Sequence, residues 1–183
     1  MSFPDDVKRL IWEAHEAWHR YFDAINRVLQ PVNPGPSDWS SIYSDLPSYM
    51  LQCDFSYMIS PRVFEEIARP ELEATCARLP RSFYHLDGVG QLAHLDALLT
   101  IEQLDGVQWV PGDGKPGCAH WPEVYQKIHA GGKKLQIISG GFDVIDAVVE
   151  QIGDRHGIHH AFFAVPIEHE AEVRSNLAAY DIL

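Results

Sequence analysis

Apolar residues recur at three- and four-residue steps along the first part of the chain. This spacing is typical of a single buried stripe on an α-helix, and it predicts a long helix over residues 4–30. The residues on the expected stripe are Val7, Ile11, Ala14, Trp18, Tyr21, Ile25 and Val28. Residues 31–48 are rich in Pro, Gly and Ser, which predicts a loop.

From residue 49 onward, strand-like and helix-like patterns alternate. Short apolar runs predict strands at 49–55, 82–86, 107–110, 134–138 and 161–165. Helical spacing predicts helices at 61–79, 90–99, 121–130, 142–152 and 168–179. Ser60 is expected to cap the first of these helices, with Pro61 at its first position. The alternation indicates parallel βαβ units in one α/β domain spanning residues 1–183.

Composition narrows the class of protein. The 183 residues suffice for one well-buried core, and a hydrophobic fraction of 46% is ordinary for a globular domain. A net charge of −12 without a Lys/Arg cluster argues against a nucleic-acid or anionic membrane surface. The amphipathic N-terminus does not resemble a signal peptide, and three cysteines without metal-type spacing suggest reduced thiols. We therefore expect a cytoplasmic protein.

His85 and Asp87 are the first candidates for chemistry, because they lie at the end of a predicted strand. In parallel α/β folds the chemistry sits beyond the carboxyl ends of the strands. Residues two apart on a strand point to the same face, about 6.5–7 Å apart along the backbone. The pair could bind a metal, move a proton or orient a substrate. Alternatively, Asp87 caps the following turn and His85 bonds a neighbouring strand.

Five other residues are candidates for a site near the ends of the predicted strands. Asp54 and Ser56 follow the first predicted strand, although both could instead serve a turn. Gln108 and Trp109 point to opposite faces of their strand. This alternation favours Gln108 as a pocket residue and Trp109 as a residue that packs against a helix. Both are nevertheless candidates for substrate binding. Ser139 lies between a strand and a helix N-terminus, where backbone N–H groups can bind an anion.

The strand pattern is compatible with two folds, a doubly wound sheet or part of a (β/α)8 barrel. No glycine-rich dinucleotide fingerprint follows the first strand, which weakens the doubly wound alternative. A whole barrel takes about 250 residues, so this chain would form part of one. An incomplete barrel leaves its inner face open to solvent. We expect this face to be covered either by a second copy of the protein or by the long first helix.

Four segments resemble the uroporphyrinogen decarboxylase superfamily, over residues from Leu51 to about Gly140. They are Gln52-Cys-Asp-Phe-Ser56, Ile59-Ser-Pro61 with Phe64-Glu-Glu66, Tyr84-His-Leu-Asp-Gly88, and Leu104-Asp-Gly-Val-Gln-Trp-Val-Pro-Gly112. The last two are the distinctive ones. The resemblance implies a (β/α)8 barrel in which these segments belong to the C-terminal half.

The same resemblance implies the chemistry. The superfamily includes cofactor-free decarboxylases of uroporphyrinogen and zinc-dependent methyltransferases acting between corrinoids and thiols. His85 matches the histidine of the methyltransferases' His-x-Cys pair, but Asp87 stands where the cysteine would be. We therefore expect a tetrapyrrole, corrinoid or small methyl donor as ligand, with His85, Asp87 and Asp54 catalytic and zinc conceivable on His85 and Asp87. The alternative is a non-catalytic half-barrel module, or one subunit of a split enzyme completed by a partner chain.

Two further groups of histidines are candidates for functional sites. His15, Glu16 and His19 fit the H-E-x-x-H pattern of zinc proteases. On the predicted helix both histidines lie about 75–115° from the centre of the buried stripe, so we expect them at its margin or in solvent. His159 and His160 precede the last predicted strand and are expected on the face away from the chemistry.

Overall fold

A single five-stranded sheet forms the centre of the molecule. The computed structural model describes residues 4–35, 37–161 and 165–180. The strands are β1 (Ser48–Gln52), β2 (Arg81–Asp87), β3 (Gly106–Val110), β4 (Lys134–Ile137) and β5 (Ile158–His160). All neighbours are parallel and follow one another in chain order. The predicted α/β class is thus confirmed.

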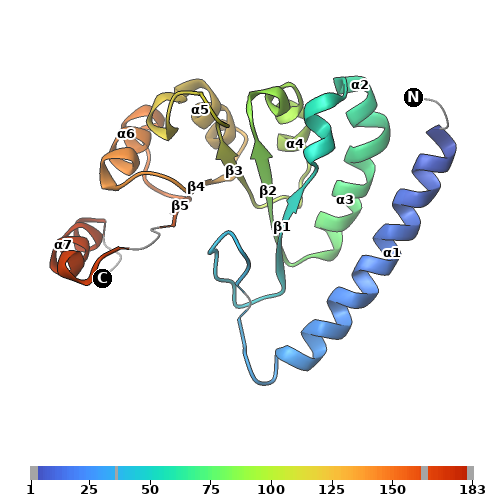
Figure 1. The fold of residues 1–183 in the computed structure, drawn as a ribbon, viewed down its shortest axis with the longest axis horizontal. Coiled ribbons are helices and arrows are strands. Elements are labelled where there is room, and N and C mark those ends of the chain that lie inside the picture. Colours follow the sequence, from blue (N-terminus) through green and yellow to red (C-terminus); the bar gives the residue numbers. More distant parts are fainter. Residues whose placement is uncertain (1–3, 36, 162–164, 181–183) are drawn as a thin grey trace.

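The helices lie along one face of the sheet (Figure 1). They are α2 (Pro61–Val63), which continues through a π-helical turn at Phe64–Ala68 into α3 (Arg69–Arg78), then α4 (Leu95–Leu99), α5 (Pro122–Ala130) and α6 (Phe142–Ile152). The last helix, α7 (Glu170–Ala179), follows β5 at the end of the sheet. Ser60 caps α2 as predicted, because its hydroxyl accepts the Val63 N–H at 3.4 Å. A doubly wound sheet reverses its strand order and carries helices on both faces. The described chain shows neither feature.

The two faces of the sheet differ in polarity. The helix-covered face is apolar and forms the core with the helices, through Leu51, Tyr84, Leu86, Val107, Trp109, Leu135 and Ile137. The opposite face, which we call the inner face, is largely polar and carries Gln52, His85, Asp87, Gln108, Gln136 and His159. Alternation along each strand separates the two sets.

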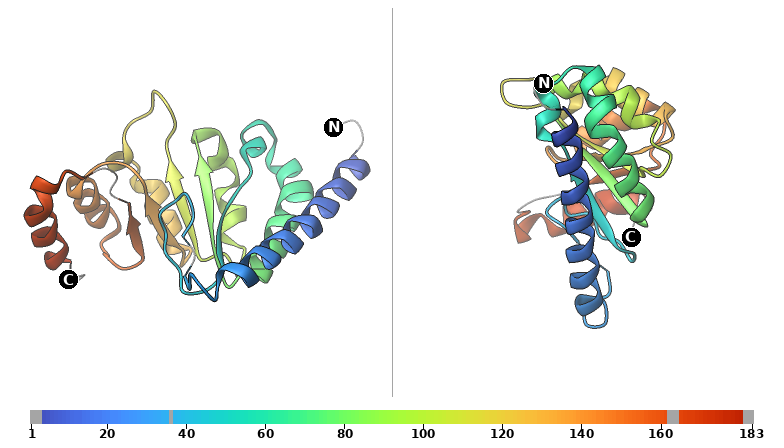
Figure 2. Two further views of the ribbon diagram at one scale, coloured as in Figure 1. Left: turned by 60° about the horizontal axis from the view of Figure 1, so that its bottom comes forward. Right: turned by 90° about the vertical axis from the view of Figure 1, so that its right-hand side faces the viewer.

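The loop before β1 covers part of the inner face. Residues 37–45 lie across the sheet on the side away from the helices (Figure 2). Gln136 Nε2 donates a hydrogen bond to the Ser40 carbonyl at 2.6 Å. A cavity of about 400 Å³ remains between this loop and the first residues of the strands, where Arg81, Lys134 and His159 line it. Of the two ways in which we expected this face to be covered, coverage by the first helix is not observed, because α1 packs against α3.

That first helix, α1 (Pro4–Leu29), has nearly the predicted length but buries a different face. His15 and His19 are its buried residues, and they face α3. Tyr21 and Val28, which we expected in the core, are 71% and 72% exposed. The prediction failed because it assigned the most apolar stripe to the core, whereas α1 docks on α3 through its aromatic and histidine side chains.

The strand ends differ from the predicted bounds in two places. β1 ends at Gln52, and residues 54–58 form a 3-10 turn instead of continuing the strand. β5 begins three residues earlier than predicted, so His159 and His160 belong to the strand instead of preceding it. Of the segment we had assigned to that strand, residues 162–164 lie outside the described residues. Within the described chain, no helix has both the length and the apolar character that a bilayer span requires.

Candidate functional site

A chain of hydrogen bonds crosses the inner face of the three central strands. His85 on β2 bonds through Nδ1 to Oε1 of Gln108 on β3. Gln108 Nε2 in turn donates to Gln136 Oε1 on β4 at 2.7 Å. Gln136 completes the chain by donating to the carbonyl of Ser40. These hydrogen bonds follow from the strand register, because His85, Gln108 and Gln136 are direct partners in the parallel ladders.

The last acceptor fixes the direction of every bond in the chain. A backbone carbonyl can only accept, so the Gln136 amide must turn its NH₂ group toward Ser40 and its oxygen toward Gln108. Gln108 then turns its own oxygen toward His85. The His85 Nδ1 is therefore the protonated donor, and in the neutral ring Nε2 carries the lone pair.

The free nitrogen of His85 faces Asp87. The Nε2 atom lies 3.7 Å from Asp87 Oδ2. The His85 side chain is only 13% exposed, whereas that of Asp87 is 48% exposed. Trp39 contacts the imidazole edge-on, with ring centroids 5.0 Å apart. The arrangement suits proton transfer, because Nε2 can accept a proton and Asp87 can stabilise the resulting imidazolium.

A small cavity lies next to Asp87 at the carboxyl ends of β2 and β3. It measures about 280 Å³ and is lined by Asp87 and Lys115, with Tyr57 and Gly88 among its walls. Gly88 has a φ of +83°, and an added Cβ would come within 3.0 Å of the Tyr57 ring. Glycine is thus required there by both backbone conformation and space.

Asp54 and Ser56 lie on the turn after β1. Asp54 is exposed at the first position of the 3-10 turn Asp54–Met58. Ser56 is fully buried, and its carbonyl accepts a hydrogen bond from His94 Nε2 at 2.8 Å. The Ser56 side chain is therefore enclosed between turns and is not brought to the His85 pair.

Trp109 and Ser139 also lie apart from the inner face. Trp109 is completely buried among the helices, with its ring 5.1 Å from that of Trp121. The alternation of Gln108 inward and Trp109 outward is confirmed, so Trp109 cannot contact a ligand on the inner face. Ser139 is exposed after β4, and its hydroxyl lies 3.0 Å from the Cys118 sulfur.

The sequence analysis did not identify three residues that reach the site, namely Gln136, Trp39 and Ser40. Gln136 could have been found, because it is a polar residue inside an apolar strand and shares the register of Gln108. Trp39 and Ser40 reach the site from a loop remote in sequence, and nothing in their local pattern indicated this.

The described residues do not form a zinc site of the catalytic kind. Catalytic zinc takes three protein ligands, and no group of three His, Cys, Asp or Glu side chains suited to a metal occurs in the described chain. Burial raises the pKa of Cys53, and it raises the pKa of Cys76 to about 11, so both remain thiols at neutral pH. His85 and Asp87 supply two ligands at most, and we assign no step to a metal.

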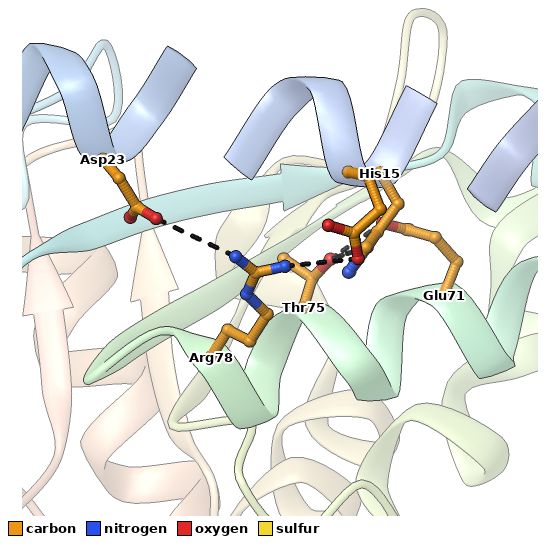
Figure 3. Close-up of polar contacts among 6 residues, drawn as sticks. His15, Asp23, Glu71, Thr75 and Arg78 are labelled. Atoms are coloured by element: carbon orange, nitrogen blue, oxygen red, sulfur yellow. Dashed lines mark hydrogen bonds and ion pairs between the residues drawn. The ribbon is translucent and has the colours of Figure 1, made fainter. Parts of the chain in front are cut away.

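The H-E-x-x-H motif on α1 serves packing against α3 (Figure 3). His15 Nδ1 lies 2.8 Å from Glu71 Oε1 and 3.1 Å from Thr75 Oγ1. Arg78 reaches Asp23 at 3.8 Å. Our expectation that His15 and His19 would lie at a solvent margin was wrong, and the helix face that a protease would open to a cleft is closed by α3.

Comparison with known proteins gives no relative: no family model, no curated protein and no solved structure matches the chain.

The direction of these hydrogen bonds predicts the tautomer of His85, which NMR can detect. Gln136→Leu removes the acceptor of the Gln108 NH₂ group, so the Gln108 amide is no longer held in one orientation and His85 loses its fixed tautomer. We expect ¹⁵N NMR of the imidazole to show Nδ1–H alone in the neutral wild-type ring and a tautomer mixture in the variant. An unchanged tautomer would contradict the directed chain.

Proposed function

We propose that the sheet is an arc of a (β/α)8 barrel whose inner face lines the barrel interior. Chain-order pairing of parallel strands, with helices α2 to α6 on one face, supports this proposal. In such a barrel the active site lies at the carboxyl ends of the strands. His85 and Asp87 lie toward that end of β2, and Asp87 lines the small cavity there.

Within this frame, the proposed function is cofactor-independent decarboxylation of a tetrapyrrole carboxylic acid, the reaction and ligand class that the resemblance to uroporphyrinogen decarboxylases implies. The observation that carries the proposal is the fixed tautomer of His85, with Nε2 3.7 Å from Asp87, a residue that lines the cavity at the strand ends. When a carboxylate leaves as CO₂, the bonding electron pair stays on the substrate carbon. The Nε2–H of protonated His85 donates its proton to that carbon, and the neutral ring is reprotonated from solvent beside Asp87.

Methyl transfer between corrinoids and thiols has less support. That chemistry in the superfamily uses zinc held by thiolates, which make the metal electron-rich. Asp87 stands in place of the expected thiolate. Tetrapyrroles remain the ligand class suggested by resemblance, and Lys115 at the mouth offers a cation for a substrate carboxylate.

A second proposal is that the arc functions as one part of a divided barrel, with a further chain completing the interior. Its support is the sheet topology, because within the described residues β1 pairs only with β2 and β5 only with β4. Unpaired strand edges are sites where another chain can add. Such a module could be non-catalytic.

Incubation with uroporphyrinogen III tests the enzymatic proposal. We expect stepwise loss of carboxyl groups, detected by chromatography of the oxidised porphyrins. His85→Ala should lower the rate by about 10²–10⁴-fold, the usual contribution of an acid–base group. The control is His120→Ala, an exposed histidine remote from the inner face. No turnover and no binding in the wild type would contradict the proposal, and methyl transfer from methylcobalamin to a thiol would favour the alternative chemistry.

A further inference from the structure

Helix α1 carries an unpartnered apolar stripe that is continuous along its length. Its exposed or half-exposed residues follow a strict alternation of three- and four-residue steps, namely Val7, Leu10, Ala14, Ala17, Tyr21, Ala24 and Val28. This is the a/d repeat of a coiled-coil seam. Leu10, Tyr21 and Val28 are 54%, 71% and 72% exposed. Soluble monomers rarely expose a contiguous apolar surface of this kind.

The stripe is distinct from the face that docks on α3. His15, His19, Trp18 and Phe22 make the contacts of α1 with α3 and β1. At 100° per residue, the a/d stripe is centred roughly 120° around the helix from that contact face. A second helix can therefore lie on the stripe without displacing α3.

Charges beside the stripe select the partner. The four residues at the g positions of the repeat are Asp6, Glu13, Arg20 and Arg27. They are acidic in the first half of the helix and basic in the second. In an antiparallel pair of identical helices, g positions face each other across the seam, so Glu13 meets Arg20 of the other copy and Asp6 meets Arg27.

The same geometry fits the core of the seam. With those charge pairs opposed, Ala14 of one helix faces Ala17 of the other, and Leu10 faces Tyr21. Alanines at the centre allow a close interaxial distance of about 8 Å. In a parallel pair the g positions would face the e positions, which are the apolar Ile11, Trp18 and Ile25. The charges therefore specify the antiparallel arrangement.

We propose that the protein forms a two-fold symmetric dimer through antiparallel pairing of α1 with α1 of a second copy. The helix is 26 residues long, which gives a seam of about 39 Å. The interface is isologous, as expected for a closed dimer. The seam uses no residue of the inner face, so the proposal does not rest on the proposed function.

Sedimentation equilibrium of the full chain over a wide concentration series tests the dimer. Glu13→Arg and Arg20→Glu should each weaken association about tenfold, since each turns two attractive pairs into repulsive ones. The double variant Glu13→Arg/Arg20→Glu restores opposite charges and should recover wild-type association. Glu73→Arg on α3, an exposed glutamate outside the stripe, is the matched control and should change nothing.

Tyr21→Glu supplies a second test that does not depend on surface charge pairs. It places a charge in the seam and should abolish association, while circular dichroism should show unchanged helix content because this side chain is exposed in the single chain. A monomer at all concentrations overturns the proposal. So does a dimer that is insensitive to Tyr21→Glu, or a double charge variant that associates no better than the single ones.

Discussion

Replacement of Trp109 by alanine is expected to lower the free energy of unfolding by about 3–5 kcal/mol, the range for aromatic truncations in a core. Trp109 is completely buried on central strand β3 and packs edge-on against Trp121. The lost side chain leaves a cavity beneath α5, which a closely packed core can fill only in part. Chemical denaturation monitored by circular dichroism would measure the change.

A second substitution at the same position isolates the polar atom of the ring. The Trp109 Nε1–H is buried and has no hydrogen-bond partner among the described residues. Trp109→Phe removes this unsatisfied donor, which offsets part of the lost packing, so we expect a loss of only about 1–2 kcal/mol. Trp39→Ala, at a half-exposed tryptophan on the loop, should cost less than either. Equal losses at Trp109 and Trp39 would contradict the assigned core.

Local patterning was sufficient for most of the fold. Alternation along the strands placed His85 and Gln108 on one face and Trp109 on the other, and the Ser60 cap was found from residue type and position. These features depend on neighbours within a few residues. β5 was misplaced because Ile158–His160 contains two histidines, and a more apolar segment follows it.

The site was harder to predict because its parts meet through tertiary contacts. Ser40 sets the orientation of His85 through two glutamine amides, although forty-five residues of sequence separate the two ends of the chain of bonds. No local pattern on the loop signals that its carbonyl accepts a bond from β4. The shared face of His85 and Asp87 on β2 could therefore be predicted from the strand pattern, while the groups that fix the His85 tautomer could not.

Helix α1 shows why hydrophobic periodicity alone misassigned a core face. Tyr21, Ile25 and Val28 of the predicted stripe are exposed in the single chain, whereas the buried residues of the helix are His15 and His19. Periodicity reports that a face avoids water, but it does not say which neighbour covers it. A helix with two partner faces has two such stripes, and only the contacts distinguish them.

We expect the buried face of α1 to make the protein sensitive to acid. Desolvation by burial lowers the pKa of His19, and the nearby Arg78 and His15 lower it further, against smaller opposing effects of Asp23 and Glu71. His19 is 1% exposed, and its Nε2 has no hydrogen-bond partner in the described chain. Protonation of His19 would therefore place a buried charge between α1 and α3 whose Nε2–H has no hydrogen-bond acceptor there.

Because the folded state holds His19 neutral, its contribution to stability is complete above the unfolded pKa of 6.5 and is lost as the pH falls below it. The unfolded chain binds the extra proton there, so stability should fall by up to about 1.4 kcal/mol per pH unit for this residue. Lowered pKa values of His159 and His160, both caused first by burial, add to the loss in the wild type.

Urea denaturation of the wild type and of His19→Leu at a series of pH values isolates the His19 contribution. Leucine keeps an apolar side chain against α3 and cannot take up a proton. We expect the stability of the variant relative to the wild type to rise progressively as the pH is lowered below 6.5. His120→Leu, at an exposed histidine that water solvates in both states, should follow the wild-type profile. Parallel profiles for the wild type and His19→Leu would mean that His19 becomes protonated without cost in the folded protein.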